Sequence, residues 1–256
     1  MTGATFPARV RSNKITMPIF SILRDRPKLC FFHLPRTGGT SLAKDLLFRN
    51  FPRWRWCHVN YDQHLRPLDG AHDPLRWSKL RQAAIQVLAG HMPFGFAARL
   101  PGHFEHITFL RAPVARAVSD YYFLRRNPSN PASAAARRLS LIEFVESDHG
   151  SSNNCYARWL SNAAFGAHFS SDAAMLETAL RNLALCSFVG ITEQFGLCAQ
   201  RLCRKFHLRP YHASERNRNR ATPPEFSLSP QERDIIERRN WLDLTIYSRV
   251  LEQVAA

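Results

Sequence analysis

Four short apolar segments along the chain each precede a polar turn. They are residues 28–34, 84–89, 106–110 and 186–191. Short, nearly continuous apolar runs are typical of strands covered on both faces, as in parallel sheets. Segments with apolar residues at helical spacing follow three of these runs, at residues 40–50, 113–122 and 193–206. Alternation of strands and helices predicts an α/β fold with a central, mostly parallel sheet flanked by helices.

The rest of the pattern divides into polar segments and two C-terminal helices. Residues 127–136 are rich in Pro, Ser, Asn and Ala, which favours a surface loop. Residues 211–230 are polar and rich in Arg, so they are not expected in the core. Helices are predicted at 230–239 and 242–254. No repeat with a period of 20 to 50 residues is visible.

The length and charge define a basic protein with one large domain. The 256 residues fit a basic N-terminal extension, 1–27, followed by a single domain, 28–256. A hydrophobic fraction of 45% excludes a largely disordered chain. The 35 Lys and Arg residues exceed the 20 Asp and Glu residues, giving a net charge of +15. This excess predicts an anionic partner: a nucleic acid, an acidic glycan, a membrane surface or a phosphorylated cofactor.

The cellular location is predicted from the lack of sequence features that are typical of membrane and secreted proteins. No apolar run reaches the ~20 residues of a membrane helix, and the N-terminal segment does not match a secretory signal. An amphipathic transit-like leader remains an alternative. The six cysteines show no metal-ligand spacing, which favours buried thiols in a reducing compartment. We therefore expect a soluble, cytoplasmic protein without a metal.

Residues 33–41, His-Leu-Pro-Arg-Thr-Gly-Gly-Thr-Ser, carry the most informative motif. They join the first predicted strand to its helix, where paired glycines allow backbone N–H groups to converge on an oxyanion. An ordinary glycine-rich turn is the alternative. The lysine of the G-K-[ST] triphosphate loop is absent, which favours a 5′-phosphate over ATP. The candidate binding residues are Arg36, Thr37, Gly38, Gly39, Thr40 and Ser41.

Two further segments add charge and a candidate base. Arg111 stands at the end of the third predicted strand, and Ser119 lies about two turns into the next helix. A guanidinium and a hydroxyl in this arrangement can hold a second phosphate, although a helix face exposed to solvent would also fit. His91 ends the second strand, where an imidazole could act as a base or could simply be a structural residue.

Together these segments resemble the PAPS-dependent carbohydrate sulfotransferases, the family that includes heparan sulfate 2-O-sulfotransferase and bacterial relatives. The first motif is similar to that family's P-K-T-G-G-T-S loop, and residues 109–122 are similar to its L-R-D-P-x-x-R-x-x-S-x-Y-Y segment. Residues 90–95 resemble its G-H segment. The resemblance extends from about residue 28 to about residue 247 and includes the segments 154–160, 188–193 and 217–220.

The resemblance implies a P-loop-like fold and a role for each motif. The loop from Arg36 to Ser41 would hold the 5′-phosphate of PAPS, and Arg111 with Ser119 would hold its 3′-phosphate. His91 would be the general base, and Arg36 would support the leaving oxygen without a metal. Two positions depart from the family pattern. Arg36 replaces a Lys, which bears on the catalytic rate, and Ala112 replaces an Asp.

The predicted function is transfer of a sulfuryl group from PAPS to a hydroxyl of an acidic or neutral glycan. The alternatives are a non-catalytic module that binds acidic polymers and a nucleotide kinase-like P-loop enzyme. Nucleic-acid binding would rest on charge alone and is not expected. The acceptor's identity and the oligomeric state are not determined by the sequence.

Several remaining residues have open roles. His33 is expected to pack under the loop, whereas His103 and His106 are expected to be structural. Glu193 and Arg158 would line the site or pair with each other. The arginines of residues 216–220 would cover the nucleotide, meet an anionic acceptor or simply face solvent.

Overall fold

A single five-stranded sheet forms the centre of the protein. The computed structural model describes residues 26–62, 64–68, 72–147, 152–211 and 227–255. Adjacent strands pair in parallel throughout, in the order β2-β3-β1-β4-β5. This arrangement confirms the expected α/β fold and makes the sheet entirely parallel. The strands are β1 (Lys28–Phe32), β2 (Trp56–Asn60), β3 (Val87–His91), β4 (Phe104–Leu110) and β5 (Phe188–Ile191).

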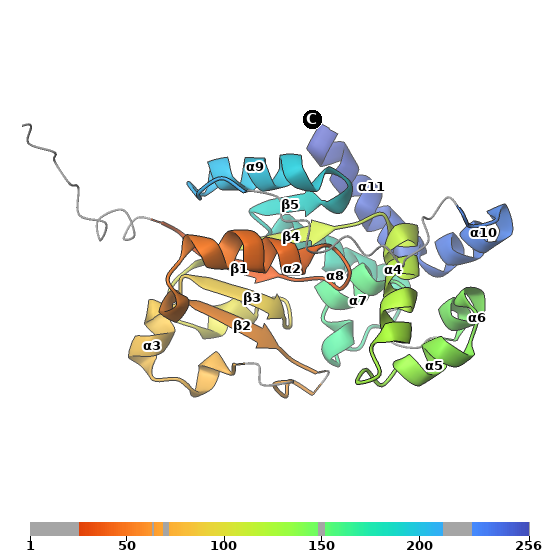
Figure 1. Cartoon of the computed structure of the whole chain (residues 1–256), viewed down its shortest axis with the longest axis horizontal. Coiled ribbons are helices and arrows are strands. Elements are labelled where there is room, and N and C mark those ends of the chain that lie inside the picture. Colours follow the sequence, from red (N-terminus) through yellow and green to blue (C-terminus); the bar gives the residue numbers. More distant parts are fainter. Residues whose placement is uncertain (1–25, 63, 69–71, 148–151, 212–226, 256) are drawn as a thin grey trace, which may run out of the picture.

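Helices surround this sheet, and several of them lie beyond the carboxyl ends of its strands. Figure 1 shows α4, α5, α6 and α10 grouped on the side toward which the arrowheads of β2 and β3 point. No helix in the described ranges is long and apolar enough to cross a membrane. The helices are α2 (Gly39–Ser41), α3 (Lys79–Ala84), α4 (Pro113–Arg126), α5 (Ser133–Arg138), α6 (Leu141–Glu146), α7 (Cys155–Leu160), α8 (Asp172–Ala184), α9 (Phe195–Lys205), α10 (Pro230–Arg239) and α11 (Trp241–Ala255).

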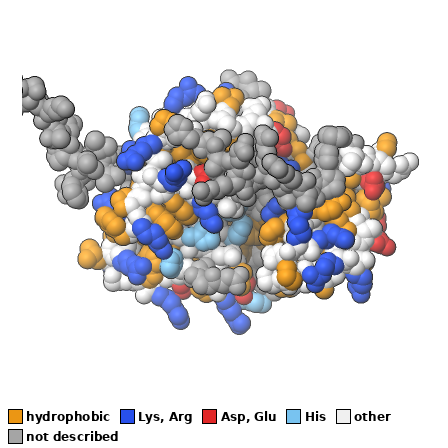
Figure 2. Space-filling view, viewed as in Figure 1, with side chains coloured by type: hydrophobic (Ala, Val, Ile, Leu, Met, Phe, Trp, Pro, Cys, Tyr) orange, Lys and Arg blue, Asp and Glu red, His pale blue; other side chains and the backbone are white. Residues whose placement is uncertain are grey.

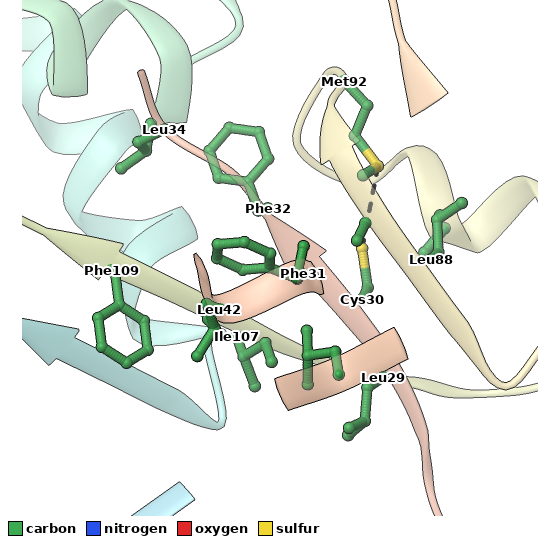
Figure 3. Close-up of a cluster of buried hydrophobic side chains, with 14 of the residues drawn as sticks. Leu29, Cys30, Phe31, Phe32, Leu34, Leu42, Leu88, Met92, Ile107 and Phe109 are labelled. Atoms are coloured by element: carbon green, nitrogen blue, oxygen red, sulfur yellow. Dashed lines mark hydrogen bonds between the residues drawn. The ribbon is translucent and has the colours of Figure 1, made fainter. Parts of the chain in front are cut away.

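The core is built around β1, the central strand. Side chains on both faces of β1 are buried, which explains why its sequence is apolar without alternation. Figure 3 shows Phe31 and Phe32 among apolar side chains contributed by neighbouring strands and by the helical segment that begins at α2. That segment continues as a π-helical turn, Leu42–Leu47, and a 3₁₀ turn, Phe48–Asn50. Burial of these side chains holds the loop between β1 and α2 against the sheet.

Some elements differ from those predicted. Residues 79–84 form α3, so the strand predicted at 84–89 lies at β3 instead. β2 was not predicted, because it lies at the edge of the sheet and is not a continuous apolar run. Its sequence, Trp-Cys-His-Val-Asn, has only two buried positions. The predicted loop at 127–136 is wrong for its last part, since α5 begins at Ser133.

The two C-terminal helices are confirmed, as α10 and α11. A capping box between Ser229 and Glu232 fixes the start of α10. Besides α3 and α5, three further helices, α6, α7 and α8, were not predicted. Their burial depends on contacts with distant elements, such as that of α7 with α8 and α11. All six cysteines are free thiols. Most of the predicted N-terminal extension, and the loop after residue 211, lie outside the described residues.

Gly90 is required where β3 passes β2. Its φ is +139°, and a Cβ placed there would lie 1.8 Å from the carbonyl oxygen of Val59. Gly90→Ala should therefore reduce the free energy of unfolding by about 3 kcal/mol, measured by urea denaturation. Gly196→Ala is the matched control, because a Cβ in that position of α9 meets no atom within 4 Å. Equal stability of the two variants would contradict this account of the β2–β3 contact.

Candidate functional site

The sheet topology places a switch point at the carboxyl ends of β1 and β4. These two strands are adjacent, but the chain after β1 continues to β2 on one side of the sheet, and the chain after β4 continues to β5 on the other. Loops that diverge from neighbouring parallel strands leave a space between them, which is the usual ligand site of such sheets. His91 ends β3, the neighbour of β1 on its other side. The three sequence motifs therefore reach the same edge of the sheet.

The loop after β1 has the backbone shape of an anion-binding turn. Arg36 and Gly38 both have positive φ angles, of 66° and 77°. Gly39 then begins the helical segment, whose first turn includes a hydrogen bond from the Ser41 N–H to the carbonyl oxygen of Gly38 at 3.1 Å. A Cβ at Gly39 would lie 2.0 Å from the ring of His33, so His33 packs under the loop as expected. The glycines are needed for this turn on steric grounds alone.

The hydroxyl groups of this loop have different environments. Thr37 is fully buried, and its Oγ1 donates to the carbonyl oxygen of Leu34 at 2.9 Å. Its hydroxyl proton therefore stabilises the turn itself. Thr40 is exposed and Ser41 is half-buried, at the first turn of the helical segment. Thr40 and Ser41 are the hydroxyls best placed to meet a ligand from solvent.

Arg36 connects the first motif to the second. Its Nε and Nη2 atoms each lie 3.3 Å from Oγ of Ser119, a residue 83 positions away on α4. The guanidinium also lies over the ring of Phe123, at 4.3 Å from the ring centroid. Burial lowers the pKa of Arg36, and the nearby guanidinium groups of Arg111 and Arg126 lower it further, against the opposing effect of Asp120. A bound anion would relieve this crowding of positive charge.

The backbone at Arg111 is held by side chains that the sequence analysis did not single out. The buried hydroxyl of Tyr156 accepts from Arg111 N at 2.9 Å and donates to Arg111 O at 2.7 Å. Thr192 Oγ1 lies 2.9 Å from the carbonyl oxygen of Leu110. Tyr156 and Thr192 lie in the segments 154–160 and 188–193, which resemble the sulfotransferase family. The local sequence of these segments did not indicate which backbone atoms the two side chains would contact.

Glu193 faces the same turn. One carboxylate oxygen accepts from Ala112 N at 2.9 Å and the other from the Tyr247 hydroxyl at 2.9 Å. Of the two roles considered for Glu193, this geometry favours lining the site through Ala112. The carboxylate also lies at the N-terminus of α4, where a negative charge is favourable. The Glu193 carboxylate therefore lies beside Ala112, the position at which the family pattern has an Asp.

His91 has its ring orientation and tautomer fixed by its neighbours. Nδ1 lies 2.7 Å from the carbonyl oxygen of His33. Because a carbonyl only accepts, Nδ1 carries the proton and Nε2 is the ring's acceptor atom. The ring stacks on that of His33 with a centroid distance of 4.4 Å, and Trp159 meets it edge-on at 5.3 Å. This is the arrangement that a general base requires: a fixed ring with one unprotonated nitrogen.

Electrostatics keep the His91 ring neutral. Burial lowers its pKa to about 4, nearby His58 contributes in the same direction, and the hydrogen bond to His33 opposes them. Burial also places the pKa of His33 well below its usual range, with His91 and Arg36 adding to the effect. The stacked pair is thus uncharged at neutral pH.

The other predicted residues lie outside this centre. His103 Nε2 lies 3.5 Å from Glu105 Oε1, and His106 stacks on Phe94. Among the described residues, no group of three or more His, Cys, Asp and Glu side chains could hold a metal ion. The arginines of 216–220 are outside the described ranges. Figure 2 shows Lys and Arg side chains spread over the visible face, on both sides of a group of His side chains.

Comparisons with known proteins agree with the motifs. No family model matches the chain. It is 26% identical over 273 residues to the human protein "Heparan-sulfate 6-O-sulfotransferase 2". The alignment covers 86% of this chain and 43% of that protein. It is 29% identical over 228 residues to the Drosophila melanogaster protein "Heparin sulfate O-sulfotransferase". The alignment covers 79% of this chain and 63% of that protein. The chain thus spans about half the length of the curated relatives it matches.

A solved structure also aligns with most of the chain. It is the mouse sulfotransferase SULT7A1 complexed with PAP, with a TM-score of 0.47, 12% identity and coverage of 82% of each chain. The sequence similarities confirm the resemblance to carbohydrate sulfotransferases that the motifs indicated.

The environment of His91 gives a measurable pH dependence. Since burial lowers its pKa to about 4, the ring should stay neutral as pH falls through 6.5, the ordinary histidine value, and gain its proton only near pH 4. A titration of the imidazole signals by NMR would measure this, with His91→Ala identifying the resonance. Protonation of His91 at or above pH 6.5 would contradict the buried, stacked geometry.

Proposed function

We propose that this chain, a relative of the heparan-sulfate O-sulfotransferases, is itself a sulfotransferase that moves a sulfuryl group from PAPS to a saccharide hydroxyl. One observation carries the proposal. Arg36 of the first phosphate motif and Ser119 of the second are hydrogen-bonded to each other, although 83 residues separate them. Two anion-binding segments that meet at one switch point suit a nucleotide with two separate phosphate positions.

The residues present fit PAPS. The glycine turn and the first N–H groups of α2, with Arg36, Thr37, Gly38, Gly39, Thr40 and Ser41, would hold the 5′-phosphosulfate end. Arg111 and Ser119 would hold the 3′-phosphate. The donor set is entirely cationic, hydroxyl and N–H groups, which suits phosphate and sulfate oxygens. The lowering of the Arg36 pKa by burial and by the nearby guanidinium groups of Arg111 and Arg126 is the electrostatic counterpart of a site built for an anion.

The chain's own residues would perform the proton and charge steps. PAPS, when bound, supplies the sulfuryl group and departs as adenosine 3′,5′-bisphosphate. Nε2 of His91 would accept the proton of the acceptor hydroxyl as that oxygen becomes bonded to sulfur. A bound polyanion would raise the pKa of His91 from its low value and make it a stronger base. Arg36 would stabilise the negative charge on the departing oxygen, and as a guanidinium it does so without giving up a proton.

The acceptor is proposed to be an acidic glycan. Beside β2, arginine side chains lie over indole rings: Arg53 over Trp56 at 4.1 Å, and Arg81 over Trp77 at 3.6 Å from the ring centroids. Such pairs present ordered guanidinium groups that can meet carboxylate or sulfate groups. Both pairs lie toward the amino end of β2, which begins at Trp56, so a glycan that meets them would extend along β2 from Asn60, the residue that pairs with His91. A cytoplasmic location remains part of the same proposal.

Replacing His91 should separate chemistry from cofactor binding. His91→Ala removes the acceptor atom for the hydroxyl proton, so kcat should fall about 10²- to 10⁴-fold. Binding of adenosine 3′,5′-bisphosphate should change less than about threefold, because the phosphate segments are intact. Sulfate transfer from labelled PAPS to a glycan panel, with calorimetry for binding, measures both. His103→Ala is the control, since this exposed histidine pairs only with Glu105 at the far end of β4. Full activity of His91→Ala would refute its role as base.

The charge of the acceptor can be tested with matched glycans. If the arginines beside β2 engage the acceptor, uronate-bearing or sulfated oligosaccharides should have a KM at least about tenfold lower than neutral ones of equal length at low salt. Raising the salt concentration should reduce the difference. Better turnover of neutral acceptors at low salt would contradict an acidic acceptor while leaving the sulfotransferase proposal intact.

A further inference from the structure

Thr192 stands at the point where the two proposed phosphate-binding segments approach each other. Its Oγ1 lies 2.9 Å from the carbonyl oxygen of Thr37, in the first segment, and 2.9 Å from that of Leu110, at the start of the second. One hydroxyl proton is therefore shared between two carbonyl groups that are far apart in sequence. The two carbonyl oxygens must remain less than two hydrogen-bond lengths apart to share it.

The position of Thr192 is set by the sheet and not by the loops that it contacts. It directly follows β5, and Ile191 is in register with Leu110 on β4. Its methyl group packs near Gly38, 3.7 Å from where a Cβ would stand at that glycine. Thr192 is thus fixed at its backbone by one rigid element while its side chain holds two flexible turns.

Tyr156 holds the second segment from the opposite direction. Its side chain is fully buried, and its hydroxyl satisfies both the N–H and the C=O of Arg111. Glu193 accepts from the next N–H, that of Ala112. Three consecutive residues at the junction of β4 and α4, Leu110, Arg111 and Ala112, are therefore held by side chains from other parts of the chain. Nothing in the proposed chemistry uses these hydroxyl groups directly.

We infer that Thr192 is a positioning residue that fixes the separation of the 5′- and 3′-phosphate-binding segments, with Tyr156 holding the 3′ segment in place. The inference rests on the proposed function, since it assumes a ligand that carries both phosphates. A ligand with two phosphates gains affinity from a preset distance between their sites, whereas a ligand with only the 5′-phosphate does not. The effect of removing either hydroxyl should therefore depend on the 3′-phosphate.

The experiment compares two nucleotides that differ only in this group. Calorimetry measures the Kd of adenosine 3′,5′-bisphosphate and of adenosine 5′-monophosphate for the full chain, and the ratio of the two is the readout. Thr192→Val should reduce the preference for the bisphosphate about tenfold, and Thr192→Ser should restore it. Tyr156→Phe, which keeps the buried ring, should reduce the preference by a similar factor.

Thr108→Val is the matched control. Thr108 is a buried threonine of β4 whose hydroxyl also donates to a carbonyl oxygen, that of Phe32, at 2.8 Å. Its loss should lower the melting temperature and leave the nucleotide preference unchanged. This variant separates a general loss of stability from a change in the distance between the two segments.

Each outcome distinguishes the inference from the proposed function. A wild-type protein that binds both nucleotides equally, or neither, would overturn the proposed function and the inference with it. A wild-type preference that persists in Thr192→Val and Tyr156→Phe would overturn the positioning role alone. Equal weakening of both nucleotides by Thr192→Val would also overturn it, because Thr192 would then support only the 5′ segment.

Discussion

The parallel pairing of β1 with β3 on one side and β4 on the other is the constraint on which the rest of the structure depends. It brings the carboxyl ends of three strands to one edge of the sheet, so that the glycine loop, His91 and Arg111 become neighbours. The buried, apolar sequence of β1 provides the free energy for this pairing. A polar site can then be assembled on a frame that does not itself need polar residues.

Backbone hydrogen bonds from side chains set the fine geometry on this frame. Loops that follow parallel strands leave carbonyl and N–H groups without partners, and burying them unpaired would be costly. Here those groups are satisfied by Thr37, Tyr156, Thr192 and Glu193. The same bonds that remove the cost also immobilise the turns. Stability and the preorganisation of an anion site therefore arise from one set of contacts.

Burial lowers the pKa of both Arg36 and His91, with different consequences for the two side chains. Around Arg36, burial and several guanidinium groups disfavour the positive charge, and Asp120 opposes them, so a bound anion would be favourable there. Around His91, burial and ring stacking favour the neutral imidazole. In the proposed function, a cationic phosphate site beside an uncharged base would suit sulfuryl transfer, because the donor is a polyanion and the acceptor hydroxyl must lose a proton.

The sequence by itself determined those features that depend on local residues. Continuous apolar segments indicated buried parallel strands, and Gly38 and Gly39 indicated a tight turn before a helix. Hence the fold class, the C-terminal helices and the main candidate residues could be named in advance. The edge strand β2 and the helices α6 to α8 could not, because their burial depends on distant partners. Only the tertiary structure decided that Arg36 meets Ser119, that His33 fixes the tautomer of His91, and that Thr192 bridges two segments. Each of these contacts joins residues far apart in the chain, and a hydrogen bond depends on where two atoms lie in space, which local sequence patterns do not specify.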